Sequence, residues 1–340
     1  MADNEPLVME ESYLPVNLFP DLSIDVMKTQ NMNILYLEDL KLINVTYNRR
    51  SFIYSNSSPF TFMIKLKQHD LGFRLQGEYR MTQKIIFFDI DGTLLNDDKE
   101  LPVSAEEAVQ QLKDDGHIVV LATGRAPFNF KKLRKRLDIT SYISLNGQYV
   151  VLNNQVIYKN PLNINALNEL IAFAADQSHP LLYANHEQWR SKMKHNDRLR
   201  NIIGSLKVPY EITFEAPPYG ESENFQALLF CEADEEEHYQ ERFDQFHFVR
   251  WHDYTVDVLP KGGSKALGIE RLIEAAGLKL ENAYAFGDGL NDMEMLDYIP
   301  NSVAMGNALD PVKNVAKHVT KTVDDDGILH GLKMVGLLIK

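Results

Sequence analysis

Short apolar runs that each end in polar residues mark the chain from residue 85 onward. The first run, residues 85–88, is followed by Asp89, and a second run covers residues 118–122. Continuous apolar runs of this length suit strands that are buried on both faces, as in a parallel sheet. Further runs of strand-forming residues occur at 142–145, 254–259, 282–286 and 302–305. The pattern predicts a sheet in the interior of the protein.

Segments with helical spacing separate these predicted strands. Ser104 and Glu107 have the spacing of a capping box, and Gly116 ends the segment that follows them. Apolar residues recur at helical spacing within it, at Ala105, Ala108, Val109 and Leu112. A second helix is expected after Lys265, and a hairpin over 148–158 is expected to turn at Asn153-Asn154. Strands that alternate with helices predict an α/β fold with a parallel, helix-covered sheet.

The pattern changes between residues 163 and 250. A predicted helix at 164–174 precedes predicted strands at 181–183, 225–231 and 246–251, and an acidic helix is expected at 234–243. This order predicts a separate, small α+β unit. We therefore expect a first part of the core domain at 81–162, the α+β unit at 163–252, and a second part of the core domain, which includes the strand at 254–259, at 253–340.

The first 80 residues carry no recognisable motif. Apolar and polar residues alternate at 60–67, which predicts a strand, and the stretch 34–47 is also rich in strand formers. Met81 resembles an ordinary protein start. We expect the functional domain to begin there and residues 1–80 to be an extension of unknown role.

Composition and charge narrow the range of partners and compartments. A net charge of −13 argues against a nucleic-acid backbone or an anionic membrane as the partner. The single cysteine, Cys231, excludes an internal disulfide and a cysteine-rich zinc site, which fits a reducing cytosol. No apolar run approaches the ~18 residues of a membrane helix, and the acidic N-terminus is unlike a secretory signal. We expect a soluble, cytoplasmic protein whose oligomeric state the sequence does not reveal.

Two carboxylates follow the first apolar run at positions i and i+2. Asp89 and Asp91 fall on the same side of an extended backbone, where they repel each other unless a proton or a cation lies between them. A hard divalent ion with oxygen ligands, most simply Mg²⁺, removes this repulsion. The pair Asp91-Gly92 is equally typical of a plain hairpin turn, so this stretch alone does not decide between a site and a turn.

Polar residues at the ends of the other predicted strands favour a site. Ligands bind beyond the carboxyl ends of the strands in open parallel sheets. The groups expected there are Asp89, Asp91, Thr123, Asn146, Asp288, Asn291 and Asp292, with Lys265 at a helix start. Several acids with one lysine and neither histidine nor cysteine form an oxygen-donor site that suits Mg²⁺ rather than zinc.

Such a site suits phosphoryl transfer. Asp89 can attack phosphorus to give an acyl phosphate, while Lys265 and Thr123 hold phosphoryl oxygens. Asp91 can protonate the leaving oxygen and then activate water, which requires that its pKa is raised by its surroundings.

Other charged or glycine-rich stretches have simpler interpretations. The glycine pairs at 262–263 and 287–289 match neither a P-loop nor a dinucleotide-binding pattern. The basic segment 131–136 and the run 235–237 are interpreted as solvated helix faces. One further hypothesis places substrate-gripping groups in the α+β unit, at His186, Trp189, Arg190 and Lys192.

Four pieces in this order resemble the haloacid dehalogenase (HAD) superfamily of phosphatases. They are Asp89-Ile-Asp91-Gly-Thr, Thr123-Gly-Arg, Ser264-Lys265 and Gly287-Asp288-Gly-Leu-Asn291-Asp292. The α+β unit between the second and third pieces is similar to that of subfamily IIB and its Cof-type hydrolases, as are Asn146-Gly147 and the segment 304–307. The resemblance covers about 82–340 and implies a Rossmann-like core with an inserted α+β cap that sets specificity.

The resemblance also implies roles for individual residues. Asp89 would be the nucleophile and Asp91 the general acid/base. Mg²⁺ would be bound by Asp89, Asp91 (through its backbone carbonyl) and Asp288, with Asp292 supporting the metal from outside. Phosphate would be held by Thr123, Gly124, Lys265 and Asn291. The family pattern favours Lys265 over Lys261, which lies four residues earlier.

The expected function is hydrolysis of small phosphorylated metabolites, such as sugar phosphates, with Mg²⁺ as cofactor and an aspartyl-phosphate intermediate on Asp89. A phosphomutase that uses the same intermediate is one alternative, and a non-catalytic metabolite-binding protein is another. Retention of Asp91 favours hydrolysis, because this residue can activate water.

Overall fold

The computed structural model describes two separate units of the chain. The first spans Met1–Thr82 and the second spans Gln83–Lys340. The described residues are 51–55, 62–68, 71–75, 83–193, 199, 212–214 and 223–338. Among these described residues, no helix is long and apolar enough to cross a membrane.

The first unit contains a small antiparallel sheet. Strands β1 (Ser51–Ser55), β2 (Phe62–Gln68) and β3 (Leu71–Leu75) pair in that order. The alternating stretch at 60–67 overlaps β2, so a strand does form there. The stretch 34–47 lies outside the described residues.

An eight-stranded sheet forms the core of the second unit. Its order is β17-β16-β15-β4-β5-β6-β7-β8, with the strands from β17 to β6 parallel and β7 and β8 antiparallel. The strands are β4 (Ile85–Phe88), β5 (Ile118–Ala122), β6 (Ser141–Ser144), β7 (Tyr149–Leu152), β8 (Gln155–Lys159), β15 (Ala283–Gly287), β16 (Asn301–Ala304) and β17 (His318–Val319). The expected α/β core and the hairpin are both confirmed, and Asn153 and Asn154 at the turn each have positive φ.

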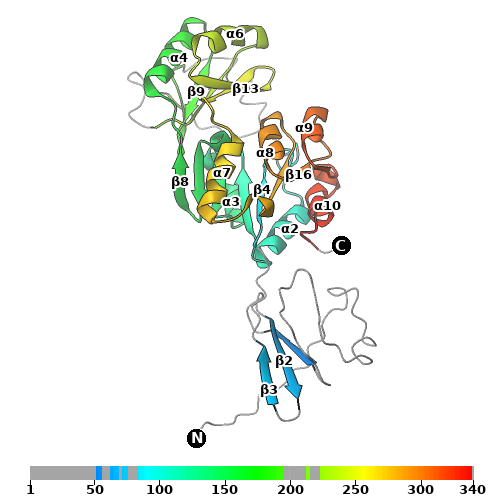
Figure 1. Ribbon diagram of the computed structural model, residues 1–340. Coiled ribbons are helices and arrows are strands. Elements are labelled where there is room, and N and C mark those ends of the chain that lie inside the picture. Colours follow the sequence, from blue (N-terminus) through cyan, green and yellow to red (C-terminus); the bar gives the residue numbers. More distant parts are fainter. Residues whose placement is uncertain are drawn as a thin grey trace. The chain divides into compact units, whose positions relative to one another are not determined.

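Helices cover both faces of this sheet (Figure 1). Phe88 faces a buried cluster that includes residues of α2 and α10, whereas Phe87 faces a cluster that includes residues of α7, α8 and α9. The helices are α2 (Val103–Asp114), α3 (Lys131–Arg136), α7 (Lys265–Ala276), α8 (Met293–Tyr298), α9 (Asp310–Val315) and α10 (Gly327–Met334). Successive residues of β4 are thus buried on opposite faces, which is why the strand is apolar throughout.

The capping box predicted for α2 is wrong. The helix begins at Val103, so Ser104 lies inside the first turn and Pro102 is the N-cap residue, which makes no side-chain cap. The predicted apolar face is confirmed, because Ala105, Ala108, Val109 and Leu112 are all buried.

A six-stranded sheet forms the cap. Its order is β11-β10-β9-β12-β14-β13. The strands are β9 (Leu181–Ala184), β10 (Trp189–Ser191), β11 (Ile212–Phe214), β12 (Gln226–Leu229), β13 (Phe246–His252) and β14 (Thr255–Pro260). Helices α4 (Ile164–Asp176) and α6 (Ala233–Arg242) pack on one face of this sheet, at the top of Figure 1.

One strand lies in a different sheet from the one we expected. We expected 254–259 in the second part of the core, but β14 pairs with β12 and β13, so the cap sheet extends to Pro260. An apolar run indicates that a strand is buried but not which sheet it joins. The two-residue turn at Asp253-Tyr254 keeps β14 against β13, because so short a connection allows only an antiparallel hairpin.

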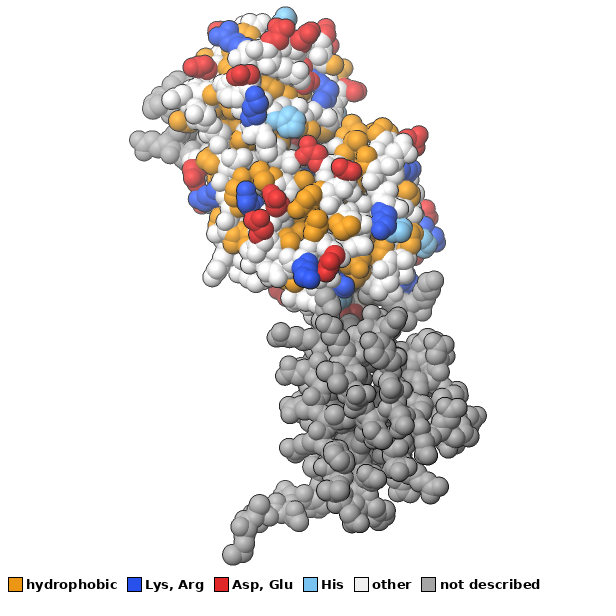
Figure 2. All heavy atoms as spheres, viewed as in Figure 1, with side chains coloured by type: hydrophobic (Ala, Val, Ile, Leu, Met, Phe, Trp, Pro, Cys, Tyr) orange, Lys and Arg blue, Asp and Glu red, His pale blue; other side chains and the backbone are white. Residues whose placement is uncertain are grey.

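The two charged helices differ in how exposed they are. Helix α3 has no buried residue, as expected for a solvated face. In the second helix, α6, acidic side chains gather on the surface, as Figure 2 shows. Glu236 of α6 is an exception, because it is buried and accepts a hydrogen bond from Arg250 Nε at 2.7 Å. The interpretation of the whole run 235–237 as solvated is therefore wrong at Glu236.

Candidate active site

The polar residues predicted at the strand ends lie together at the carboxyl edge of the core sheet. Asp89 directly follows β4, and Thr123 follows the neighbouring strand β5. Asp288 follows β15, which pairs with β4 on the other side. Because these strands are parallel neighbours, their ends bring the three side chains to one place.

Lys265 connects two buried carboxylates at this edge. Its Nζ lies 2.6 Å from Asp89 Oδ1 and 2.6 Å from Asp292 Oδ1. The three residues are 2%, 5% and 0% exposed, respectively. Ser264 caps α7 by accepting a hydrogen bond from the Leu267 amide, which fixes Lys265 at the first position of the helix. The exposed Lys261 is not part of this contact.

Burial and charge act on these groups in opposite directions. Burial raises the pKa of Asp89 well above its usual value, and the negative charge of Asp292 raises it further, although Lys265 opposes both. Burial alone would lower the pKa of Lys265, but the charges of Asp292 and Asp89 outweigh it and raise that pKa. The site therefore holds a lysine that stays cationic among carboxylates that repel one another.

A cluster of three acids at this edge could hold a divalent cation. Carboxylate oxygens of Asp89, Asp288 and Asp292 lie within 4.8 Å of one another. Burial and the charge of Asp292 raise the pKa of Asp288 to about 7. Gly92 permits this crowding, because a Cβ atom there would lie 2.1 Å from Asp288 Oδ2. Lys265 offsets only one of the three negative charges, and oxygen donors at this spacing with excess negative charge fit Mg²⁺.

Asp292 differs from the other two acids because both of its oxygens already have partners. Oδ1 contacts Lys265, and Oδ2 accepts hydrogen bonds from the backbone amides of Asp288 and Gly289 at 3.0 and 2.9 Å. These bonds hold the loop that presents Asp288. The arrangement suits a carboxylate that holds Lys265 and the 288–289 loop in place rather than one that binds a metal ion directly.

The carboxylate of Asp91 lies away from the acid cluster. It pairs with Arg125, whose Nε lies 2.6 Å from Oδ2, and with Lys99, whose Nζ lies 2.6 Å from Oδ1. Burial raises the pKa of Asp91, but the hydrogen bonds and charges of Arg125 and Lys99 outweigh it, so that the pKa lies below its usual value. The expectation that its surroundings raise this pKa is therefore wrong for the unliganded site.

The neutral groups expected to hold phosphate lie around one amide side chain. Thr123 is buried, and the Oδ1 atom of Asn146 accepts a hydrogen bond from Asn291 Nδ2 at 3.3 Å. A Cβ atom at Gly124 would lie 3.0 Å from the same Oδ1 atom. Asn146 thus links the ends of three strands, β5, β6 and β15.

A carboxylate of the cap also reaches Asn146. Asp257 Oδ2 accepts a hydrogen bond from Asn146 Nδ2 at 2.5 Å, and Oδ1 accepts one from Trp251 Nε1 at 2.9 Å. Burial raises the pKa of Asp257 to about 7, although its hydrogen-bond donors oppose the shift. Asp257 was not among the site residues predicted from the sequence. The signal was a charged residue in the middle of an apolar strand, Thr255-Val-Asp-Val-Leu.

The proposed substrate-gripping group of the cap does not form one cluster. Trp189 is buried and donates a hydrogen bond from Nε1 to Asn129 Oδ1 of the core at 3.0 Å. Arg190 is its neighbour on β10, so the two side chains point to opposite faces of the sheet. His186 instead stacks on Tyr149, with ring centroids 5.2 Å apart. Trp189 and Arg190 therefore do not face one ligand together.

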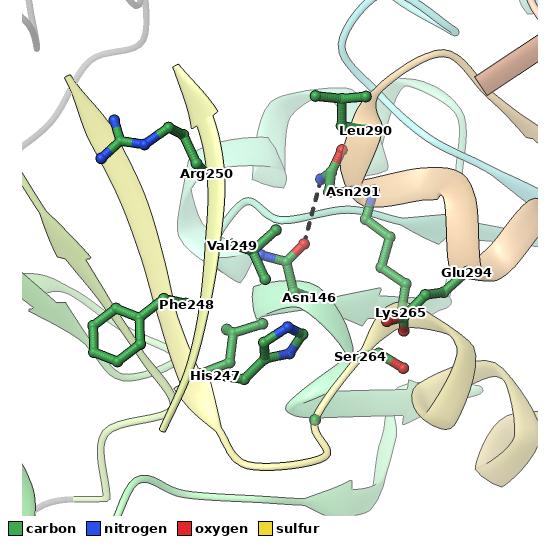
Figure 3. A pocket seen from close by; sticks show the side chains of 12 residues that line it. Asn146, His247, Phe248, Val249, Arg250, Ser264, Lys265, Leu290, Asn291 and Glu294 are labelled. Atoms are coloured by element: carbon green, nitrogen blue, oxygen red, sulfur yellow. Dashed lines mark hydrogen bonds between the residues drawn. The ribbon is translucent and has the colours of Figure 1, made fainter. Parts of the chain in front are cut away.

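A cavity of about 270 Å³ adjoins the site between cap and core. In Figure 3, His247 and Val249 of β13 point toward the cavity, whereas Phe248 and Arg250 point away from it. Core residues at its other side include Asn146, Lys265 and Asn291. Lys265 joins the cavity to the buried acids, because it lines the former and contacts Asp89.

Comparisons with known proteins agree with this fold. The family model for haloacid dehalogenase-like hydrolases matches residues 86–332. A Bacillus subtilis protein named "Putative phosphatase YkrA" is 46% identical over 258 residues, which cover 76% of this chain and 100% of that protein.

Solved structures lead to the same family. A hypothetical protein from Geobacillus kaustophilus is 48% identical, with a TM-score of 0.71, and covers 75% of this chain and 100% of its own. The HAD subclass IIB sugar phosphatase BT4131 is 31% identical, with a TM-score of 0.68, over 75% of this chain and 100% of its own. These matches confirm the resemblance drawn from the four sequence pieces: the chain belongs to the haloacid dehalogenase-like hydrolase family and is a phosphatase.

Proposed function

We propose that this phosphatase hydrolyses small phosphomonoesters with the help of Mg²⁺, through an aspartyl-phosphate intermediate on Asp89. The observation that carries the proposal is the buried group of Asp89, Asp288 and Asp292 around Lys265. Such a group combines a carboxylate nucleophile with cations that neutralise phosphoryl oxygens.

In the first step, an Asp89 carboxylate oxygen attacks phosphorus, and the bond from phosphorus to the ester oxygen breaks. Thr123, Gly124, Lys265 and Asn291 hold the phosphoryl oxygens. Lys265 is suited to this role because its positive charge is retained at the buried site. In the second step, water attacks phosphorus, and the bond from phosphorus to Asp89 breaks to release inorganic phosphate.

Mg²⁺ bound by Asp89, Asp288 and the backbone carbonyl of Asp91 would neutralise charge that develops on the phosphoryl group. Asp292 supports this site by holding the 288–289 amides. The close oxygens of Asp89, Asp288 and Asp292 favour this assignment, since carboxylates so placed repel without a cation.

Asp91 acts as the general acid and then as the general base. Its pairing with Arg125 and Lys99 keeps it ionised in the unliganded site. A phosphate dianion brought close would raise the pKa of Asp91 and compete for the two cations. Asp91 can then take up a proton, give it to the leaving oxygen, and in the second step accept one from water.

The substrate class is inferred from the cavity and from relatives. A volume of about 270 Å³ with His247, Ser264 and Glu294 in its lining suits a compact polar leaving group such as a sugar. One solved relative is named a sugar phosphatase, and a curated relative is named 5-amino-6-(5-phospho-D-ribitylamino)uracil phosphatase. We propose that the cap, which contributes His247, sets specificity.

Phosphate release and acceptor dependence distinguish hydrolysis from the alternatives. A phosphomutase would require a second hydroxyl acceptor, and a metabolite-binding protein would release no phosphate. The presence of Asp91, which can activate water, two residues after Asp89 favours hydrolysis. The lone cysteine, Cys231, fits a reducing compartment, and we propose the cytoplasm.

The test is phosphate release from a panel of phosphorylated metabolites, with Mg²⁺ and after its removal by a chelator. We expect turnover that depends on Mg²⁺ and falls by at least ~10³-fold in Asp89→Asn, because the amide is not a nucleophile. Asp176→Asn, at the exposed end of α4, is the matched control and should retain turnover. Turnover that survives in Asp89→Asn would contradict the mechanism, and its absence from the unaltered, metal-replete chain would contradict the function.

A further inference from the structure

Asp257 is a buried carboxylate on the face of the cap sheet that meets the core. Its neighbours Val256 and Val258 pack on the opposite face, in the cluster that contains α4 and α6. Asp257 is only 3% exposed. Burial of a charge is costly unless hydrogen bonds compensate for it, so a carboxylate at this place requires an explanation.

The hydrogen-bond partners of Asp257 come from both the cap and the core. Trp251 and Gln226 are cap residues, and Trp251 Nε1 donates to Oδ1 at 2.9 Å. Asn146 belongs to the core, and its Nδ2 donates to Oδ2 at 2.5 Å. The carboxylate thus bonds the cap sheet to the loop that follows β6.

The backbone around Asn146 is fixed in an unusual conformation. Leu145 and Asn146 both have φ of 52°, in the left-handed region that a leucine rarely adopts. Gln148 Nε2 donates to the Asn146 carbonyl oxygen at 2.7 Å. Such a strained loop persists only where its surroundings hold it, and here it holds the Asn146 side chain at the strand ends.

The two ends of the Asn146 amide have opposite hydrogen-bonding roles. Nδ2 donates to Asp257, while Oδ1 accepts from Asn291 Nδ2 at 3.3 Å. An ionised carboxylate can only accept, so in its ionised form Asp257 fixes which end of the amide faces the cap. If the amide turned over, Asn146 would present a donor to the donor of Asn291, and Asn291 would lose its acceptor.

We propose that Asp257 is a positioning residue that acts through Asn146 on the phosphate-binding Asn291. The contact between cap and core then orients the group that binds phosphate. The affinity for phosphate therefore depends on a cap residue that does not touch phosphate. The inference rests on the proposed role of Asn291 in phosphate binding.

A double-mutant cycle on Asp257→Asn and Asn146→Gly tests the proposal. Glycine suits the positive φ at position 146, so this variant removes the amide without straining the loop. The readouts are competitive inhibition by inorganic phosphate, together with KM and kcat for one phosphomonoester. We expect each single variant to weaken phosphate binding by about tenfold, and the double variant to weaken it no further.

Glu236→Gln is the matched control, because Glu236 is also a buried cap carboxylate but pairs with Arg250 on the outer face. We expect its phosphate inhibition constant to change by less than about twofold. If Asp257→Asn does not fold, Asp257→Ala replaces it, since alanine places no donor against Trp251 or Asn146.

The proposal would be overturned if the double variant lost as much phosphate-binding free energy as the two single variants together. An unchanged inhibition constant for phosphate in a folded Asp257 variant would also overturn it. A thermal shift caused by inorganic phosphate with Mg²⁺ gives the same comparison without turnover. Lack of turnover in the unaltered chain would therefore contradict the proposed function alone, whereas loss of the coupling with turnover intact would contradict only this inference.

Discussion

At the scale of single residues, the site depends on one buried lysine among acids. Lys265 is 2% exposed and contacts Asp89 and Asp292, which are also buried. Removal of one partner from a buried ion pair leaves an uncompensated charge in the interior. The same contact that favours the ionised form of Asp89, against the effect of burial, therefore also stabilises the fold.

We expect Lys265→Met to lower turnover by at least ~10²-fold, because a cation is lost from the phosphoryl group and from Asp89. The free energy of unfolding should fall by about 3 kcal/mol, because two carboxylates stay buried without their cation. Steady-state kinetics and urea unfolding measure the two effects.

Lys261→Met is the control for this variant. Lys261 lies in the same loop, four residues earlier, but its side chain is exposed. We expect neither turnover nor stability to change by more than a small amount. Loss of turnover in Lys261→Met, with Lys265→Met active, would reverse the assignment of the phosphate-binding lysine.

At the scale of elements, the start of α7 is placed by its close contact with the loop 145–147. Gly147 has φ of 93°, and a Cβ atom there would lie 2.0 Å from the Ser264 carbonyl oxygen. Gly268, one turn into α7, also lies against Gly147. The loop and the helix approach so closely because neither backbone carries a side chain at the contact.

Gly147→Ala should therefore move the loop or the start of α7. We expect a loss of stability of about 2–4 kcal/mol from the clash and the left-handed backbone together, with a raised KM because Lys265 is displaced. Gly277→Ala is the control, because Gly277 also has positive φ but open space around it. This control should cost about 1 kcal/mol and leave KM unchanged. Equal losses in the two variants, by urea unfolding, would contradict the close-contact argument.

The sequence predicts the core strands and the site, but neither the sheet that β14 joins nor the direction of the Asp91 pKa shift. Apolar runs revealed the core strands because a parallel strand is buried on both faces, and the acids that end them revealed the site. The sheet that β14 joins could not be predicted, since burial alone does not specify a partner strand. The depressed pKa of Asp91 also escaped prediction, because Lys99 and Arg125 reach it through the fold.

At the scale of the whole molecule, the cap and the core of the second unit share buried surface. One apolar cluster contains Leu182 and Leu228 of the cap together with Phe88 and Leu121 of the core. The Trp189–Asn129 hydrogen bond crosses the same boundary. The described strands of both sheets and the described helices that cover them all lie within residues 83–338, so this unit has its own buried apolar clusters on which to fold.

We therefore expect a chain that begins at Met81 to fold and to retain phosphatase turnover. The family model matches within this region, at 86–332, and a relative whose full length matches covers only 76% of this chain. Thermal unfolding should lie within a few degrees of the full chain, and kcat/KM within about twofold. A chain that begins at Leu101 is the control: it lacks β4, which pairs with both β5 and β15, and it should not fold. An insoluble or inactive Met81 chain would show instead that residues 1–80 contribute to the fold or to the site.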